Sequence, residues 1–192
     1  MTDSYISELQ KPNPSAIIQL YELELVEGTH YATGNPDNVT TTYCWHSGMT
    51  AAGAGSIVFN SKTYTPMPIE AEGFDQKSGQ SDAIARPVLR VSNLLSTVST
   101  ILIEVNKITP GNDLLNAKLT RIETLAMFLD GESTANTNAT SRNQVFIIDR
   151  KSTENREVVE FELSAIWDLP NFKIPARQVL PRQFPGVGSF HE

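Results

Sequence analysis

Hydrophobic and polar positions alternate most clearly near the end of the chain, in the run EVVEFELSAIW of residues 157–167. Alternation with a period of two is typical of a strand that buries one face. The predicted buried face carries Val159, Phe161, Leu163, Ala165 and Trp167. Residues 143–150 lie on the other side of a polar turn, KSTENR. The two runs together predict a half-buried antiparallel hairpin.

Three further stretches also predict strands. Residues 16–26 begin with apolar positions on both faces, and one face becomes acidic further along. Residues 57–67 read as a hairpin around Asn60-Ser61-Lys62, and Pro66 and Pro68 favour an edge or a strand end because proline cannot donate to a ladder. Residues 86–91 form the next predicted strand.

Two stretches predict helices. Residues 3–10 form a short one that stops before Lys11-Pro12-Asn13-Pro14, since proline disfavours helix at and before itself. Residues 94–108 form a longer one, capped by Ser92 or Asn93 and ended by Pro110-Gly111. Its apolar stripe consists of Leu94, Leu95, Val98, Ile101, Leu102 and Val105.

Three remaining stretches complete the organisation. The spacing of apolar residues in 115–129 is compatible with a helix, and periodicity alone leaves helix and strand open. Residues 131–142 are too polar for a core. Four prolines after Asp168 predict an extended arm. We therefore expect an N-terminal arm with a short helix over 1–14, a β-rich domain over 15–168 and a Pro-rich C-terminal arm over 169–192.

Composition excludes several classes of protein. The 192 residues are 40% hydrophobic and 19% charged, as in an ordinary folded chain. A net charge of −7 disfavours a general nucleic-acid binder, which needs basic residues to neutralise phosphates. No apolar run has the roughly 18 to 20 residues of a membrane span, and the N-terminus does not resemble a secretory signal. The single cysteine, Cys44, excludes an internal disulfide and favours synthesis in a cytoplasm.

No catalytic or metal-binding constellation emerges from the motifs. Cys44 and His46 could form a nucleophilic pair, or a zinc site with His30 and His191, but the pair has no orienting partner and a structural interpretation is favoured. Gly53-Ala54-Gly55 lacks the frame of a phosphate loop. The carboxylate pairs that could mimic a glycosidase lack an aromatic sugar platform; they are Glu22 with Glu24 and Glu160 with Glu162.

Arg86, before Pro87, and Arg90 have two interpretations. They are either solvated charges on an edge strand, which is the simpler interpretation, or partners in a salt bridge between subunits.

The stretch NSKTYTPMPIEAEGFDQKSGQSDAIARPVLRVSNL resembles the lambda-like phage minor tail protein L family. The family pattern is Y-x-P-x-P-I, then Gly-Phe, a Gly-containing polar loop and R-P-x-L-x-V-S-N. The matching residues are Tyr64, Pro66, Pro68, Ile69, Gly73, Phe74, Gly79, Arg86, Pro87, Leu89, Val91, Ser92 and Asn93. Similar features at IIQLYELEL, LAMFLDG and the final hairpin extend the resemblance over residues 16–186. The family also favours a strand within residues 108–129.

The resemblance implies a mainly β fold, an antiparallel barrel or sandwich of the phage tail-tube and hub type with one packed helix at about 93–107. It implies a structural protein of the virion's tail tip, made in the host cytoplasm. Three or six copies would form a ring between the tube end and the receptor-binding hub, with other tail-tip and hub proteins as partners. DNA would pass only as cargo, and the protein would not insert into a membrane. The alternatives are an assembly factor absent from the finished virion and, less favoured, a cell-wall hydrolase.

The lambda member of the family continues into a cysteine-rich domain that holds an iron–sulfur cluster. This chain stops at GVGSFHE with one cysteine, whereas a cluster needs about four thiolates, so we expect no cofactor in it. A cluster on a partner chain stays open.

The expected contact elements are the loop between Gly73 and Arg86 and the C-terminal arm. The candidate interface residues are Gly73, Phe74, Lys77, Gln80, Arg86, Arg90, Pro170, Phe172, Pro175, Arg177 and Phe184.

Overall fold

The computed structural model describes residues 3–34, 40–47, 55–74, 86–94, 96–141 and 143–166. In chain order the elements are α1 (Asp3–Leu9), β1 (Ile17–Glu24), β2 (Thr42–His46), β3 (Ile57–Phe59), β4 (Lys62–Pro66), β5 (Ile69–Glu72), β6 (Val88–Ser92), α2 (Thr97–Ile108), β7 (Lys118–Leu125), a 3-10 helix (Ala126–Phe128), β8 (Gln144–Glu154) and β9 (Val158–Ala165). The mainly β class with one longer helix is confirmed. No helix in these ranges is long and apolar enough to cross a membrane.

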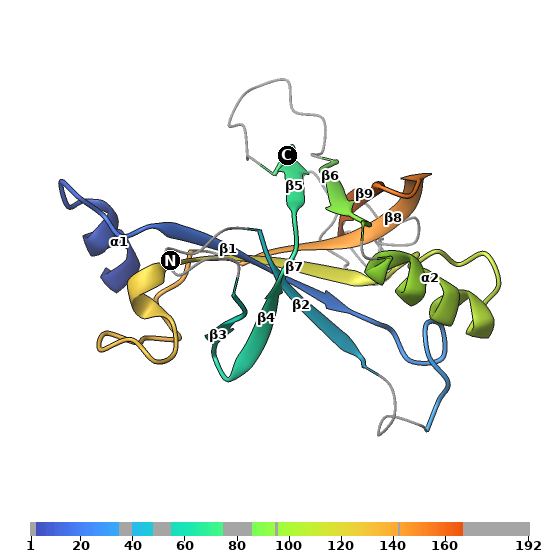
Figure 1. Cartoon of the computed structure of the whole chain (residues 1–192), viewed down its shortest axis with the longest axis horizontal. Coiled ribbons are helices and arrows are strands. Elements are labelled where there is room, and N and C mark those ends of the chain that lie inside the picture. The colour runs from blue at the N-terminus through green and yellow to red at the C-terminus, as the bar shows by residue number, and fades with distance from the viewer. Residues whose placement is uncertain are drawn as a thin grey trace, which may run out of the picture.

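The described strands form one nine-stranded sheet in the order β3-β4-β2-β1-β7-β8-β9-β6-β5 (Figure 1). All neighbours are antiparallel except β2 and β4, which are parallel. This parallel pair was not predicted, because it depends on a non-local contact and not on a local hairpin.

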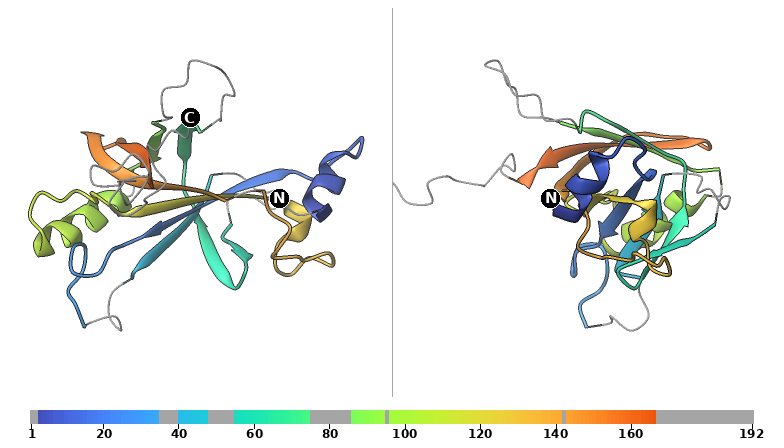
Figure 2. Two further views of the ribbon diagram at one scale, coloured as in Figure 1. Left: turned by 180° about the vertical axis from the view of Figure 1, so that it is seen from behind. Right: turned by 90° about the vertical axis from the view of Figure 1, so that its left-hand side faces the viewer.

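The link between β4 and β5 shows how the sheet curls. These strands lie near opposite ends of the sheet order, yet only Met67 and Pro68 separate them in the chain. The Met67 amide donates to the carbonyl of His46 in β2 (3.0 Å), and the Ser92 amide of β6 donates to the carbonyl of Pro68 (2.9 Å). The link thus joins the two sides of the sheet, which closes into an incomplete barrel (Figure 2). The expected barrel or sandwich class is consistent with this topology.

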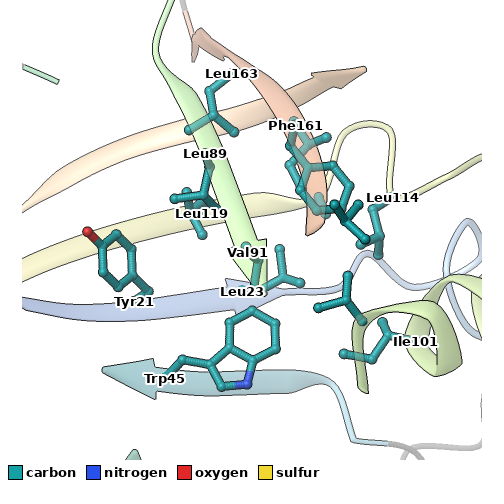
Figure 3. Close-up of a cluster of buried hydrophobic side chains, with 14 of the residues drawn as sticks. Tyr21, Leu23, Trp45, Leu89, Val91, Ile101, Leu114, Leu119, Phe161 and Leu163 are labelled. Carbon is teal, nitrogen blue, oxygen red and sulfur yellow. The ribbon is translucent and has the colours of Figure 1, made fainter. Parts of the chain in front are cut away.

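The main core fills the concave side of the sheet (Figure 3). Tyr21 and Leu23 of β1 point into it, as do Trp45 of β2 and Phe161 of β9. The predicted buried face of residues 157–167 is confirmed for the four members in the described range, all of which are buried; Trp167 lies outside that range. Helix α2 closes the core with Val98, Ile101, Leu102 and Val105.

The other face of β1 is also buried, which explains its apolar start on both faces. Leu20 packs there with Ile122 of β7 and with Phe59 and Tyr64 of the β3–β4 hairpin. This hairpin turns at Asn60 and Ser61, both with positive φ, as a two-residue turn of the primed type requires. A third cluster brings Tyr5 of α1 against Leu125, Phe128 and Ala139.

The start of α2 corrects one prediction. The helix begins at Thr97 and not at residue 94, so Leu94 does not belong to its apolar stripe; its side chain is 73% exposed. Asn93 nevertheless serves the capping role expected of it, because its Oδ1 accepts a hydrogen bond from the Ser99 amide (3.2 Å). Between Asn93 and Ser99 the backbone of Ser96 lies in the left-handed region. Residue type alone does not predict this geometry.

Three further predictions are resolved. The ambiguous segment contains strand β7, so a strand is confirmed there. The predicted turn KSTENR is wrong in extent, because β8 continues to Glu154 through two register shifts and only residues 155–157 separate it from β9. The polar loop over 131–142 was wrongly excluded from the core, since Ala139 is fully buried in the third cluster.

Candidate assembly surface

His30, one of the candidate metal ligands, links two parts of the chain through hydrogen bonds of its ring, a contact called the His30 staple below. Its Nδ1 accepts a hydrogen bond from the Val26 amide (2.8 Å), and its Nε2 lies 2.9 Å from the carbonyl oxygen of Leu115. A carbonyl only accepts, so Nε2 carries the proton and the ring is neutral. With both nitrogens occupied, His30 joins the chain after β1 to the turn before β7 and cannot also bind a metal.

Replacing His30 with glutamine is expected to flatten the dependence of stability on pH. Burial, the dominant effect, lowers the pKa of His30 below its ordinary value of 6.5. Protonation of Nδ1 would also break its bond with Val26. The unfolded chain therefore binds this proton more readily, so stability is full above about pH 6.5 and falls as the pH drops below it. Urea unfolding at pH 8 and 5.5 measures this; an equal loss in His30→Gln and the unaltered protein would contradict it.

Cys44 and His46 lie two residues apart on β2, but the structure does not arrange them for chemistry. His46 is fully buried and donates from Nε2 to the carbonyl of Gly55 (3.0 Å). Burial and then the charge of Glu22 raise the pKa of the Cys44 thiol, with Lys62 opposing. A thiol kept protonated in this way is a poor nucleophile and a poor metal ligand.

Both carboxylate pairs that could have served a glycosidase are held in ion pairs within the sheet. Glu22 accepts from Tyr64 and Lys62, and Glu24 accepts from Lys118 (2.7 Å). On β9, Glu160 pairs with Arg90 (2.7 Å) and Glu162 with Arg150 (2.6 Å). Within the described ranges no three His, Cys, Asp or Glu residues gather as a metal site would need. These carboxylates act as cross-strand partners of basic residues.

Gly73 and Phe74 anchor the end of β5. Gly73 has a φ of +76°, and a Cβ there would lie 3.4 Å from the Cα of Pro87, so glycine suits both the turn and the close approach. Phe74 is buried: its ring meets Phe146 edge-on at 5.2 Å, and Arg121 lies over it at 5.2 Å. Phe74 therefore belongs to the chain's own core, which argues for a fold role at this candidate interface position.

Arg90 of β6 lies at the centre of a charged cluster on the β5–β6–β9 surface. Its guanidinium is 2.7 Å from Glu160, 3.1 Å from Glu72 and 3.4 Å from Glu70. Three carboxylates thus share one cation, and the Glu70 and Glu72 side chains are more than half exposed. Arg90 is satisfied within the chain, and the charge left over on this surface is negative.

An apolar groove of about 820 Å³ lies beside this cluster, where the β4–β5 link crosses to β6 and β9. Its lining is mostly apolar and includes Met67, Pro68, Ile69, Val91, Leu94 and Val158. Its wall also carries the carboxylates of Glu70 and Glu157 and the guanidinium of Arg90. The volume is in the range of binding sites, and the apolar lining with few polar groups is typical of a docking surface.

The structure thus places four candidate interface residues near one another. Gly73 and Phe74 directly follow β5. Arg86 lies just before β6 and Arg90 lies on β6, the strand that pairs with β5. The others lie outside the described residues: Lys77, Gln80, Pro170, Phe172, Pro175, Arg177 and Phe184. Sequence reasoning missed the groove because Leu94 was assigned to a helix face. The Pro-x-Pro-Ile run of residues 66–69 was the one available signal.

The family model described as phage minor tail protein L matches residues 37–185. The match includes strands β2 to β9 and helix α2, together with both the groove and the charged cluster. It begins after β1, so the resemblance expected for residues 16–36 lies outside it.

Proposed function

This chain belongs to the phage minor tail protein L family, and we propose that within the tail it is a structural subunit of the tip. Copies would form a ring around the DNA channel and join the end of the tail tube to the receptor-binding hub. The family match over most of the chain is the observation that carries this proposal. Its virion tail location follows from the family, and the position at the tip is the further step.

The surface described above supports an assembly role. A stable protein interface buries about 1,600 Å² in total and has an apolar centre with a polar rim. The groove supplies the apolar centre, and the carboxylates around Arg90 supply the rim. The chain's net charge of −7 also suits a channel wall, since like charge does not retain passing DNA.

The two alternatives predict different behaviour. An assembly factor would bind tail proteins but be absent from finished particles. A cell-wall hydrolase would lose activity when a carboxylate or His46 is replaced. In the described chain the paired carboxylates serve as ion-pair partners, which favours the structural role.

Light scattering tests the ring directly. The purified protein is measured alone and after mixing with the other tail-tip proteins of the same phage. We expect a mass three or six times the 21.2 kDa of the chain, either alone or in a complex that forms only with the partners. A protein that stays monomeric with every tail partner would contradict the proposal.

A further inference from the structure

The apolar groove has chemistry that a particular segment of this chain complements. The groove combines an apolar lining with the negative surplus around Arg90, where Glu70, Glu72 and Glu160 share one guanidinium. A suitable occupant is an extended segment with apolar anchors and adjacent cations. A proline-rich segment suits this description, because it is already extended and loses little conformational entropy on binding.

Residues 167–192 have this composition. They carry Lys173, Arg177 and Arg182 against Asp168 and Glu192, a net charge of +1, whereas the chain as a whole carries −7 and the remainder therefore −8. The segment is thus basic relative to the surface that bears the groove. The order of its residues also fits. Between Pro170 and Pro175 the sequence is NFKI, so in an extended backbone Phe172 and Ile174 share one side and Lys173 the other.

The length and direction of the chain favour the groove of a neighbouring copy. Phe172 follows Ile166 by six residues and can lie at most about 20 Å from it, even fully extended. The groove lies level with residues 158–160 of β9, whereas the segment leaves from the Ala165 end, about 16 to 23 Å away along the strand. The segment would also have to reverse direction to return. A neighbouring copy's groove does not require this reversal.

We infer that the groove binds the C-terminal segment of a neighbouring copy, with Phe172 and Ile174 in the apolar lining and Lys173 and Arg177 facing the carboxylates of Glu70 and Glu72. This inference rests on the proposed ring. Each copy gives its segment to one neighbour and receives another, so the contact is head-to-tail and closes into a ring when the rotation allows. The Arg90 cluster then serves as an acidic receptor and not as the basic partner of an inter-subunit salt bridge.

Disulfide cross-linking in the full chain tests this assignment. In a Cys44→Ser background, Leu94→Cys on the groove is combined with Phe172→Cys on the segment. The matched control combines Phe172→Cys with Ile103→Cys, because Ile103 is also exposed (58%) but lies on α2 outside the groove lining. Leu94 and Ile103 are both solvent-exposed, so we expect each variant to keep the melting temperature of the unaltered protein. Particles assembled with each variant are oxidised mildly and analysed on non-reducing gels.

We expect a ladder of dimers and larger species for the Leu94 pair, at least fivefold stronger than for the Ile103 pair. A product that runs only as cross-linked monomer would overturn the inference, because the segment would then fill its own groove. So would equal cross-linking of the two pairs. If the unaltered protein itself is missing from the particles, the proposed function fails; if it is present but the Leu94 pair forms no ladder, only the groove assignment fails.

Discussion

Replacing Phe161 with alanine is expected to lower the free energy of unfolding by about 3 to 5 kcal/mol. Phe161 is 3% exposed and lies on β9 directly opposite Leu89 of β6, with its ring facing the turn at Leu114 and helix α2 (Figure 3). The surrounding core is tightly packed, with a cavity of only about 10 Å³, so its side chains have little freedom to move into the space that the ring would leave. The loss comes from the buried ring itself and from the void that it leaves.

The effect is large against the total stability of a domain, which is about 5 to 15 kcal/mol. Urea unfolding followed by circular dichroism measures it, with Ile103→Ala as the control, because that side chain is mostly exposed on α2. The control is expected to change stability by less than about 0.5 kcal/mol. A loss below about 1 kcal/mol for Phe161→Ala would show that the sheet and α2 do not share one core.

Replacing Tyr64 with phenylalanine is expected to cost about 1.5 to 3 kcal/mol, the range for a hydrogen bond to a charged group. Tyr64 is fully buried, and its hydroxyl donates to Oε1 of the buried Glu22 (2.5 Å). Burial and then this bond raise the pKa of Tyr64, so the phenol remains a donor at all ordinary pH values. Without it, Lys62 (2.8 Å on Oε2) is the partner that Glu22 keeps among the described residues, and a desolvated carboxylate oxygen loses its own partner.

A double-mutant cycle separates this bond from simple packing. Glu22→Leu removes the carboxylate, so the hydroxyl of Tyr64 no longer has a charge to satisfy. The double variant with Tyr64→Phe is expected to be more stable than the sum of the single losses predicts, because it leaves no carboxylate unpaired. Additive losses would indicate that the contact between Tyr64 and Glu22 contributes no coupling energy.

Strands that bury one face could be predicted, because alternation of apolar and polar residues is a local signal in the sequence. Val159, Phe161, Leu163 and Ala165 alternate with polar neighbours, and they are buried as the pattern requires. The hairpin over residues 57–66 was also predictable, but its turn is shorter than expected, because Lys62 already belongs to β4 and pairs with Phe59. Strand β7 was harder, because its apolar residues face two different cores and their spacing imitates a helix: Leu119 joins the main cluster and Ile122 the second.

The remaining features of the fold depend on contacts between residues that are far apart in the sequence. Nothing local indicates that Met67 and Pro68 bridge β2 and β6, or that β2 and β4 run parallel. Leu94 shows how this dependence on non-local contacts led to a wrong assignment at the candidate site. Its apolar character was assigned to a helix face, whereas the helix starts later and the side chain lines the groove. Arg90 was a candidate from the sequence, but its three carboxylate partners come from two neighbouring strands and could not be predicted locally.

These observations give the carboxylates, the buried histidine and the groove separate roles. Ion pairs across the strands and the His30 staple hold the barrel together. The groove and the acidic rim lie on the surface, where we propose that a neighbouring subunit binds.

The copy number in finished particles tests the central claim most directly. Phage particles are purified, digested and quantified by mass spectrometry against isotope-labelled peptides from this chain and from the protein of the tail tube. The account predicts three or six copies of this chain in each particle. Its absence from particles whose other tail proteins are present at full number would contradict a structural role in the tip and would identify the chain as an assembly factor.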